Sequence, residues 1–157
     1  MNRQVSRVRR RASGVEILLL LATIGCATVP RTPTYCAGLR GEGPGSDALD
    51  PDASGSARLE LGGASIRFHV TTSSNLGKVV ATHLHEGAAG VNGPMVVELN
   101  PGFTGKVLDG SIPVESDLAA RVLSNPGQFY VKLHSLKFPG GAIRGQLHPC
   151  GSGNGIP

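Results

Sequence analysis

Apolar and polar residues alternate along much of the chain between residues 56 and 148. The alternation is clearest on either side of Gly62 and Gly63, where the apolar positions are Ala57, Leu59, Leu61, Ile66, Phe68 and Val70. Successive side chains of a strand point to opposite faces, so this pattern predicts two half-buried strands. The glycine pair between them predicts a tight turn and therefore a β-hairpin.

Further short strands are predicted over residues 78–85, 94–99, 105–112, 128–134 and 142–148, separated by glycine, proline and asparagine. One segment, residues 115–124, has helical spacing instead. Leu118 and Val122 lie one helical turn apart, and Asn125-Pro126-Gly127 ends the segment. Many short strands with one short helix predict an all-β fold, an antiparallel β-sandwich.

The segments at either end of this pattern are predicted to lie outside the sandwich. Residues 26–49 are rich in Pro, Gly, Ser and Asp and are expected to form a tether and an irregular segment. The folded domain is then expected over residues 50–150, and residues 151–157 form a polar tail.

The first 25 residues have the features of an export signal. Five arginines precede the short apolar run from Ile17 to Ala22, which is too short to span a bilayer as a helix. The following Thr23-Ile24-Gly25-Cys26 resembles a lipobox, in which the cysteine is acylated after cleavage. We therefore expect a signal peptide over residues 1–25 and a cell-envelope lipoprotein anchored in a membrane through Cys26, in the outer membrane if the organism has one. Plain secretion is the alternative.

This signal changes what the charge implies. The chain has 15 Lys and Arg against 11 Asp and Glu, a net charge of +4, and residues 1–25 supply all of the excess through five Arg and Glu16. The remainder is balanced, with 10 residues of each sign. Nucleic-acid binding requires a basic face for the phosphates, so we expect no nucleic-acid partner.

Two cysteines remain once Cys26 is assigned to the lipid. Cys36 and Cys150 form an even pair in an exported chain, which predicts a disulfide between them. Such a bond would close a loop of more than 100 residues. In the chain-entropy model it stabilises the fold by up to about 4–5 kcal/mol.

The candidate chemistry lies in three histidines. His83 and His85 share one face of a predicted strand, and His134 ends another. If these strands are neighbours, the imidazoles can converge on one Zn or Cu ion, with their nitrogens within about 4 Å of one another. The alternative is that they hydrogen-bond the following glycine-rich turn. Because no fourth ligand is recognisable, the favoured expectation is that the protein has no cofactor. A bound Zn or Cu ion is the alternative.

Other residues near the histidines are weaker candidates for a binding site. Gly87, Gly90 and Gly93 lack the Gly-x-Gly-x-x-Gly spacing of a phosphate loop, so we expect a tight turn with positive φ at several of them. Glu86 is a candidate extra ligand or supporting group for the histidines. Arg144 could bind a carboxylate ligand, but we favour a structural salt bridge or backbone contact across the sandwich.

A salt bridge would join Arg144 to Glu86 or Glu98. No catalytic residue is assigned, because the chain has no Gly-x-Ser-x-Gly motif and its cysteines have other uses.

Three stretches, residues 81–97, 129–135 and 139–147, resemble the CHRD domain, a module named after chordin and widespread in bacterial exported proteins. The resemblance spans roughly residues 50–148. It implies an immunoglobulin-like or superoxide-dismutase-like β-sandwich and no general enzymatic activity. The expected function is a non-catalytic interaction or structural module of the cell envelope, with an envelope protein or glycan as partner. The alternative is a metal-binding or redox protein, since His83-x-His85 also resembles the copper-ligand pair of Cu/Zn superoxide dismutases.

Overall fold

The computed structural model describes residues 31–41, 50–73, 76–100, 103 and 105–151. The predicted signal peptide, Cys26 and nearly all of the polar tail lie outside these residues. No helix within the described part of the chain is long and apolar enough to cross a membrane.

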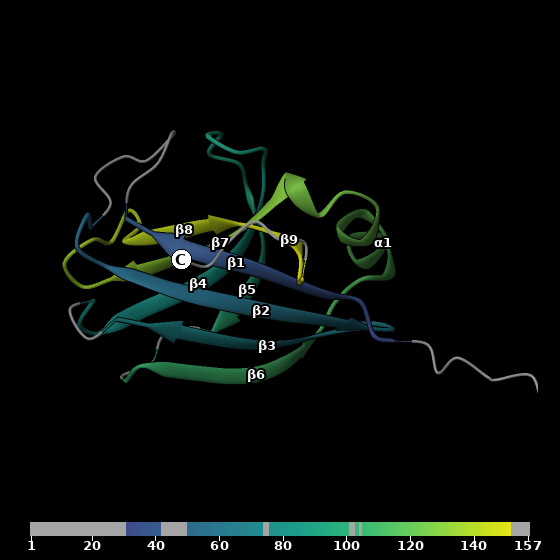
Figure 1. Ribbon diagram of the computed structural model, residues 1–157, viewed down its shortest axis with the longest axis horizontal. Coiled ribbons are helices and arrows are strands. Elements are labelled where there is room, and N and C mark those ends of the chain that lie inside the picture. Colours follow the sequence, from purple (N-terminus) through teal and green to yellow (C-terminus); the bar gives the residue numbers. More distant parts are fainter. Residues whose placement is uncertain (1–30, 42–49, 74–75, 101–102, 104, 152–157) are drawn as a thin grey trace, which may run out of the picture. The chain divides into compact units, whose positions relative to one another are not determined.

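The described residues form nine antiparallel strands and one α-helix (Figure 1). The elements are β1 (Thr34–Arg40), β2 (Ser54–Gly62), β3 (Ser65–Thr72), β4 (Val79–Glu86), β5 (Met95–Asn100), β6 (Val107–Pro113), α1 (Ser116–Ser124), the 3-10 turn η1 (Pro126–Gln128), β7 (Phe129–Ser135), β8 (Ile143–Gln146) and β9 (His148–Pro149). The strand order is β5-β4-β7-β8-β1-β2-β3-β6, and β9 pairs with β1. This single sheet folds over into two layers, so the predicted all-β sandwich with one short helix is confirmed.

The core lies between the two layers. Alternate residues of the strands point inward and are almost completely buried, among them Leu39, Leu59, Ile66 and Val70 from one layer and Leu84, Val131, Leu133 and Ile143 from the other. Burying such a side chain contributes about 1.5–3 kcal/mol. Leu118 and Val122 of α1 join the same cluster, as the helical spacing predicts.

The N-terminal boundary of the domain differs from the prediction. Residues 26–49 are expected to be irregular, but β1 occupies Thr34–Arg40 and pairs with β2 along its whole length. Tyr35, Ala37 and Leu39 are its buried positions. The alternation is present in the sequence but is short and set among prolines and glycines, and pairing with β2 and β9 stabilises it.

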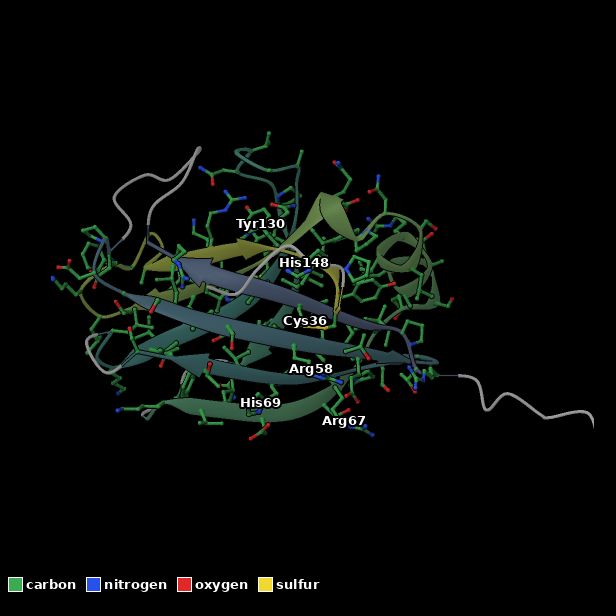
Figure 2. The ribbon with its side chains drawn as sticks, in the orientation of Figure 1. Cys36, Arg58, Arg67, His69, Tyr130 and His148 are labelled. Carbon is green, nitrogen blue, oxygen red and sulfur yellow. A yellow bond between two sulfur atoms is a disulfide. The ribbon has the colours of Figure 1, made fainter. Side chains whose placement is uncertain are left out.

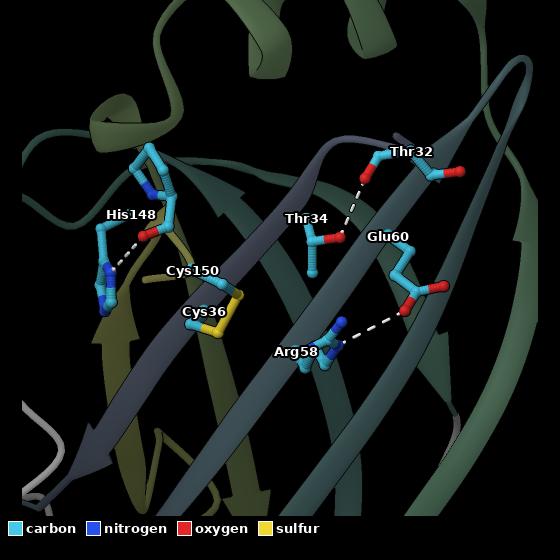
Figure 3. Close-up of a disulfide and its surroundings, with 8 residues drawn as sticks. Thr32, Thr34, Cys36, Arg58, Glu60, His148 and Cys150 are labelled. Carbon is cyan, nitrogen blue, oxygen red and sulfur yellow. Dashed lines mark hydrogen bonds and ion pairs between the residues drawn. A yellow bond between two sulfur atoms is a disulfide. The ribbon is translucent and has the colours of Figure 1, made fainter. Parts of the chain in front are cut away.

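A disulfide joins the two ends of the domain. Cys36 in β1 bonds to Cys150, which follows β9 and lies 114 residues further along the chain (Figure 3). The predicted pairing is therefore confirmed. It joins β1 to the residue after β9, and these two strands are neighbours in the sheet although the other strands separate them along the sequence.

Candidate metal centre

Pairing of β4 with β7 brings the three candidate histidines together on the outer face of the sheet. In this pairing Ala81 lies opposite His134 and His83 lies opposite Lys132. One ligand atom from each of His83, His85 and His134 lies within 4.8 Å of the others. The His83 ring centre is 5.7 Å from that of His85 and 4.9 Å from that of His134.

The limit of 4.8 Å on the separation of the ligand nitrogens is wider than the expected 4 Å. Nitrogens around a tetrahedral ion with bonds of about 2.0–2.1 Å lie about 3.4 Å apart. To share an ion, the ligand nitrogens would have to approach one another by up to about an ångström and a half.

Backbone carbonyls determine which ring nitrogens are free to bind. Nδ1 of His85 lies 3.0 Å from the carbonyl oxygen of Gly93, and Nδ1 of His134 lies 2.8 Å from that of Pro139. A carbonyl can only accept, so each Nδ1 carries the proton and donates it. In the neutral ring each Nε2 then keeps its lone pair for a metal, the arrangement usual in metal-binding histidines.

These Nε2 atoms are buried without a partner. Neither Nε2 of His85 nor Nε2 of His134 has a hydrogen bond among the described residues. Leaving a buried acceptor unsatisfied costs about 1–3 kcal/mol. A cation placed between the rings would remove this cost at both atoms.

The histidines favour the neutral form that a metal requires. Burial lowers the pKa of His83, His85 and His134. The neighbouring histidines also lower the pKa of His83, and the positive charge of Lys132 lowers the pKa of all three. At neutral pH the three rings are thus uncharged, and each can offer a nitrogen lone pair to a metal.

These lowered pKa values predict that acid destabilises the metal-free protein. The unfolded chain titrates its histidines near pH 6.5, whereas the folded chain binds those protons only at lower pH. The stability linked to neutral rings is complete above about pH 6.5 and is lost as the pH falls through the lower folded values. Melting temperatures between pH 7.5 and 5.5 should fall more steeply for the wild type than for the His85→Ala/His134→Ala double variant. Equal slopes would contradict this explanation.

The loop over residues 87–93 is fastened to the sheet beside the histidines. Nε2 of Gln146 donates to the carbonyl oxygen of Gly87 at 2.8 Å. The amide of Gly93 donates to the Tyr130 hydroxyl at 3.0 Å. Arg144 donates to the carbonyl oxygen of Val91 and to Oδ1 of Asn92. The loop therefore holds the Gly93 carbonyl in place for His85.

The three glycines of this segment serve different purposes. Gly90 has a φ of 81°, in the left-handed region as expected. Gly87 and Gly93 are not among the glycines with positive φ, so the expectation is wrong for these two. Gly93 is needed for close approach instead, because a Cβ there would overlap the carbonyl oxygen of Glu86.

Glu86 and Arg144 do not form the ion pair that the sequence suggests. Alternation along β4 directs Glu86 away from His85, and its carboxylate pairs with Arg121 of α1. The expected role of Glu86 at the histidines therefore does not hold. The Arg144 guanidinium lies 3.7 Å from the centre of the Tyr130 ring and bonds the loop. Arg144 is structural, as favoured, and it makes a backbone contact, to Val91 of the loop, in place of a salt bridge.

Two residues of the site were not predicted from the sequence as part of it. Tyr130 stacks on the His85 ring, with centres 5.0 Å apart and planes 12° apart. Lys132 lies between Tyr130 and His134 on the same face of β7. Their positions two and four residues before His134 were the available signal.

Comparison with known proteins gives one match. A family model described as the CHRD domain matches residues 37–147. No curated protein and no solved structure matches the chain. The matched range begins within β1 and ends just after β8, so it contains the three histidines and the loop that adjoins them.

Proposed function

The chain belongs to the CHRD-domain family, and from this membership and the histidine geometry we propose that it is a non-catalytic module binding one Zn²⁺ or Cu²⁺ ion. His83, His85 and His134 would be the ligands. Imidazole nitrogens suit both metals, and three protein ligands leave one coordination position open.

The observation that carries this proposal is the pair of buried Nε2 atoms without partners on His85 and His134. A purely structural role explains only the other nitrogen of each ring, which bonds a backbone carbonyl. Those bonds also orient a metal-binding ring and fix its tautomer. The carbonyl bonds and the metal are therefore compatible, and the metal accounts for the atoms that the bonds leave unsatisfied.

We further propose that the module acts outside the cytoplasm, in the cell envelope, where it contacts an envelope protein or glycan. The Cys36–Cys150 disulfide supports an oxidising compartment. The arginine-rich, apolar start of the chain and Cys26 support export and a lipid anchor.

Metal binding can be measured directly. Purified full-length protein is stripped with a chelator, dialysed against Zn²⁺ or Cu²⁺ and analysed for metal content. We expect one ion per chain, and a stabilisation of about 2.7 kcal/mol when the free metal is 100 times its Kd. His134→Ala should lower the affinity at least about 100-fold, because losing even a group that orients a ligand costs 10–100-fold.

The matched control is His69→Ala. His69 lies on β3, in the other layer from Tyr130 (Figure 2), and its Nδ1 contacts Oδ1 of Asp109 at 2.6 Å. This variant should bind metal as the wild type does. Equal binding by the wild type and His134→Ala, or no binding by the wild type, would overturn the proposal.

A further inference from the structure

The three candidate ligands are restrained to different degrees. Backbone carbonyls orient the rings of His85 and His134 through Nδ1. Within the described residues no hydrogen bond orients the ring of His83, which contacts the other two imidazoles with its plane tilted by 54° from each of them. The site therefore has two oriented donors and a third ring that can turn toward an ion placed between them.

The described residues and the solvent offer little for a fourth coordination position. The converging group of His, Cys, Asp and Glu ligand atoms in this part of the chain comprises the three histidines. Water has little access, because Nε2 of His85 and Nε2 of His134 are both buried. Zn²⁺ is almost always four-coordinate in structural sites, whereas the cuprous ion, Cu⁺, is satisfied by fewer ligands. Three imidazoles without a further ligand therefore suit Cu⁺ better.

The charge of the ligands favours the same ion. Three neutral imidazoles contribute no negative charge, and Glu98, opposite His83 on β5, is exposed and lies outside the converging group. The Born cost of moving an ion out of water rises with the square of its charge, so it is about four times larger for a divalent ion than for a monovalent ion of similar size. The absence of a carboxylate from this group of ligands thus penalises Zn²⁺ and Cu²⁺ more than Cu⁺.

A buried cation lies behind one of the oriented ligands. β4 and β8 flank β7 on opposite sides, and the Tyr130 ring of β7 lies 5.0 Å from the His85 ring and 3.7 Å from the Arg144 guanidinium. Arg144 is only 8% exposed, and its hydrogen bonds to the loop go to neutral groups of Val91 and Asn92. Its positive charge is therefore weakly screened and opposes a divalent ion more than a monovalent one.

We infer that the preferred ion of the three-histidine site is Cu⁺, bound by His83, His85 and His134 without a fourth ligand. This inference rests on the proposed metal binding and specifies the oxidation state of the ion. His85 and His134 supply the oriented nitrogens, and His83 turns to complete a three-coordinate site. Arg144 does not touch the ion and contributes to the selectivity through its charge.

The test compares the affinity of full-length protein for three ions. Cu⁺ is titrated without oxygen against bathocuproine disulfonate, with ascorbate instead of a thiol as reductant so that the Cys36–Cys150 disulfide is kept. Zn²⁺ and Cu²⁺ are titrated against chelators of known affinity. We expect Cu⁺ to bind about 100-fold more tightly than either, which places the reduction potential of the bound copper about 120 mV above that of aqueous copper. X-ray absorption of the Cu⁺ protein should show three nitrogen ligands.

Variants of the ligands and of the buried cation separate the causes. His83→Ala should lower Zn²⁺ affinity at least about 100-fold but Cu⁺ affinity only about tenfold, because two oriented imidazoles still serve Cu⁺. Arg144→Gln keeps an amide donor for the loop and removes the charge. It should shift the preference toward Cu²⁺ about tenfold, the effect of a charge about 10 Å away at an effective dielectric constant of about 20.

Two controls accompany these variants. Arg144→Lys keeps the positive charge and should keep the preference for Cu⁺ within about threefold, which separates the charge from a displacement of the loop. Arg58→Gln makes the matched substitution at an exposed arginine of β2 and should change none of the three affinities.

The possible failures are distinguishable. Wild-type protein that binds none of the three ions, or binds them no better than His134→Ala, overturns the proposed function and this inference with it. If Zn²⁺ or Cu²⁺ binds at the histidines as tightly as Cu⁺, or if X-ray absorption finds a fourth ligand on Cu⁺, only the preference for Cu⁺ is overturned. An unchanged preference in Arg144→Gln would overturn the role assigned to Arg144.

Discussion

Removing the Cys36–Cys150 disulfide is expected to lower the free energy of unfolding by about 4–5 kcal/mol. The bond joins residues 114 apart, and a loop of this length loses much conformational entropy when it is closed in the unfolded chain. Domains of this kind are stable by only about 5–15 kcal/mol in total. Urea unfolding of the Cys36→Ser/Cys150→Ser double variant, compared with the oxidised wild type, measures the difference.

Two controls accompany this measurement. Wild-type protein kept under a reducing agent should unfold at the same urea concentration as the double variant. The single variant Cys36→Ser should also match the double variant, because either substitution removes the bond. A difference between oxidised and reduced wild type below about 1 kcal/mol would contradict the expected stabilisation.

Gly93→Ala is expected to damage both the fold and the metal site. An added methyl group would overlap the carbonyl oxygen of Glu86, which is backbone and cannot rotate away. Overpacking of this kind costs about 1–3 kcal/mol, and the displaced loop also loses its bond to the Tyr130 hydroxyl, so we expect a loss of about 3 kcal/mol. Because Gly93 orients His85, metal affinity should fall about 10–100-fold.

Gly38→Ala is the matched control for this substitution. A Cβ at Gly38 would meet nothing within 4 Å, and this glycine is not among those with positive φ. Urea unfolding and metal titration of the two alanine variants, side by side, separate the crowding at Gly93 from the general effect of losing a glycine. Equal stability and metal affinity in the two variants would contradict the role assigned to Gly93.

The sequence predicts most strands because their signal is local. Alternation about Gly62 and Gly63 correctly predicts the β2–β3 hairpin, and the spacing of Leu118 and Val122 correctly predicts α1. β1 was missed because its pattern is short and because two of its partners, β8 and β9, are distant in the sequence. Pairing between distant segments is a tertiary property that a short window of sequence does not contain.

The same distinction applies to the histidines. Strand alternation predicts that His83 and His85 share a face. His134 lies beside them only because β4 pairs with β7, and the sequence alone does not establish that pairing. For Arg144 a backbone contact was one of the predicted structural roles, but its individual partners were not predicted. They are a backbone oxygen and a side chain in a loop more than 50 residues earlier, where charge complementarity gives no guide.

The covalent bond between Cys36 and Cys150 also decides how the domain responds to pulling. Tension applied between the chain before Cys36 and the chain after Cys150 travels directly through the two sulfur atoms, while nearly all of the strands lie inside the closed loop and bear none of it (Figure 3). Under such a load the oxidised domain should stay intact at forces that unravel the reduced one, so the histidine cluster on β4 and β7 would keep its shape while the ends are stretched.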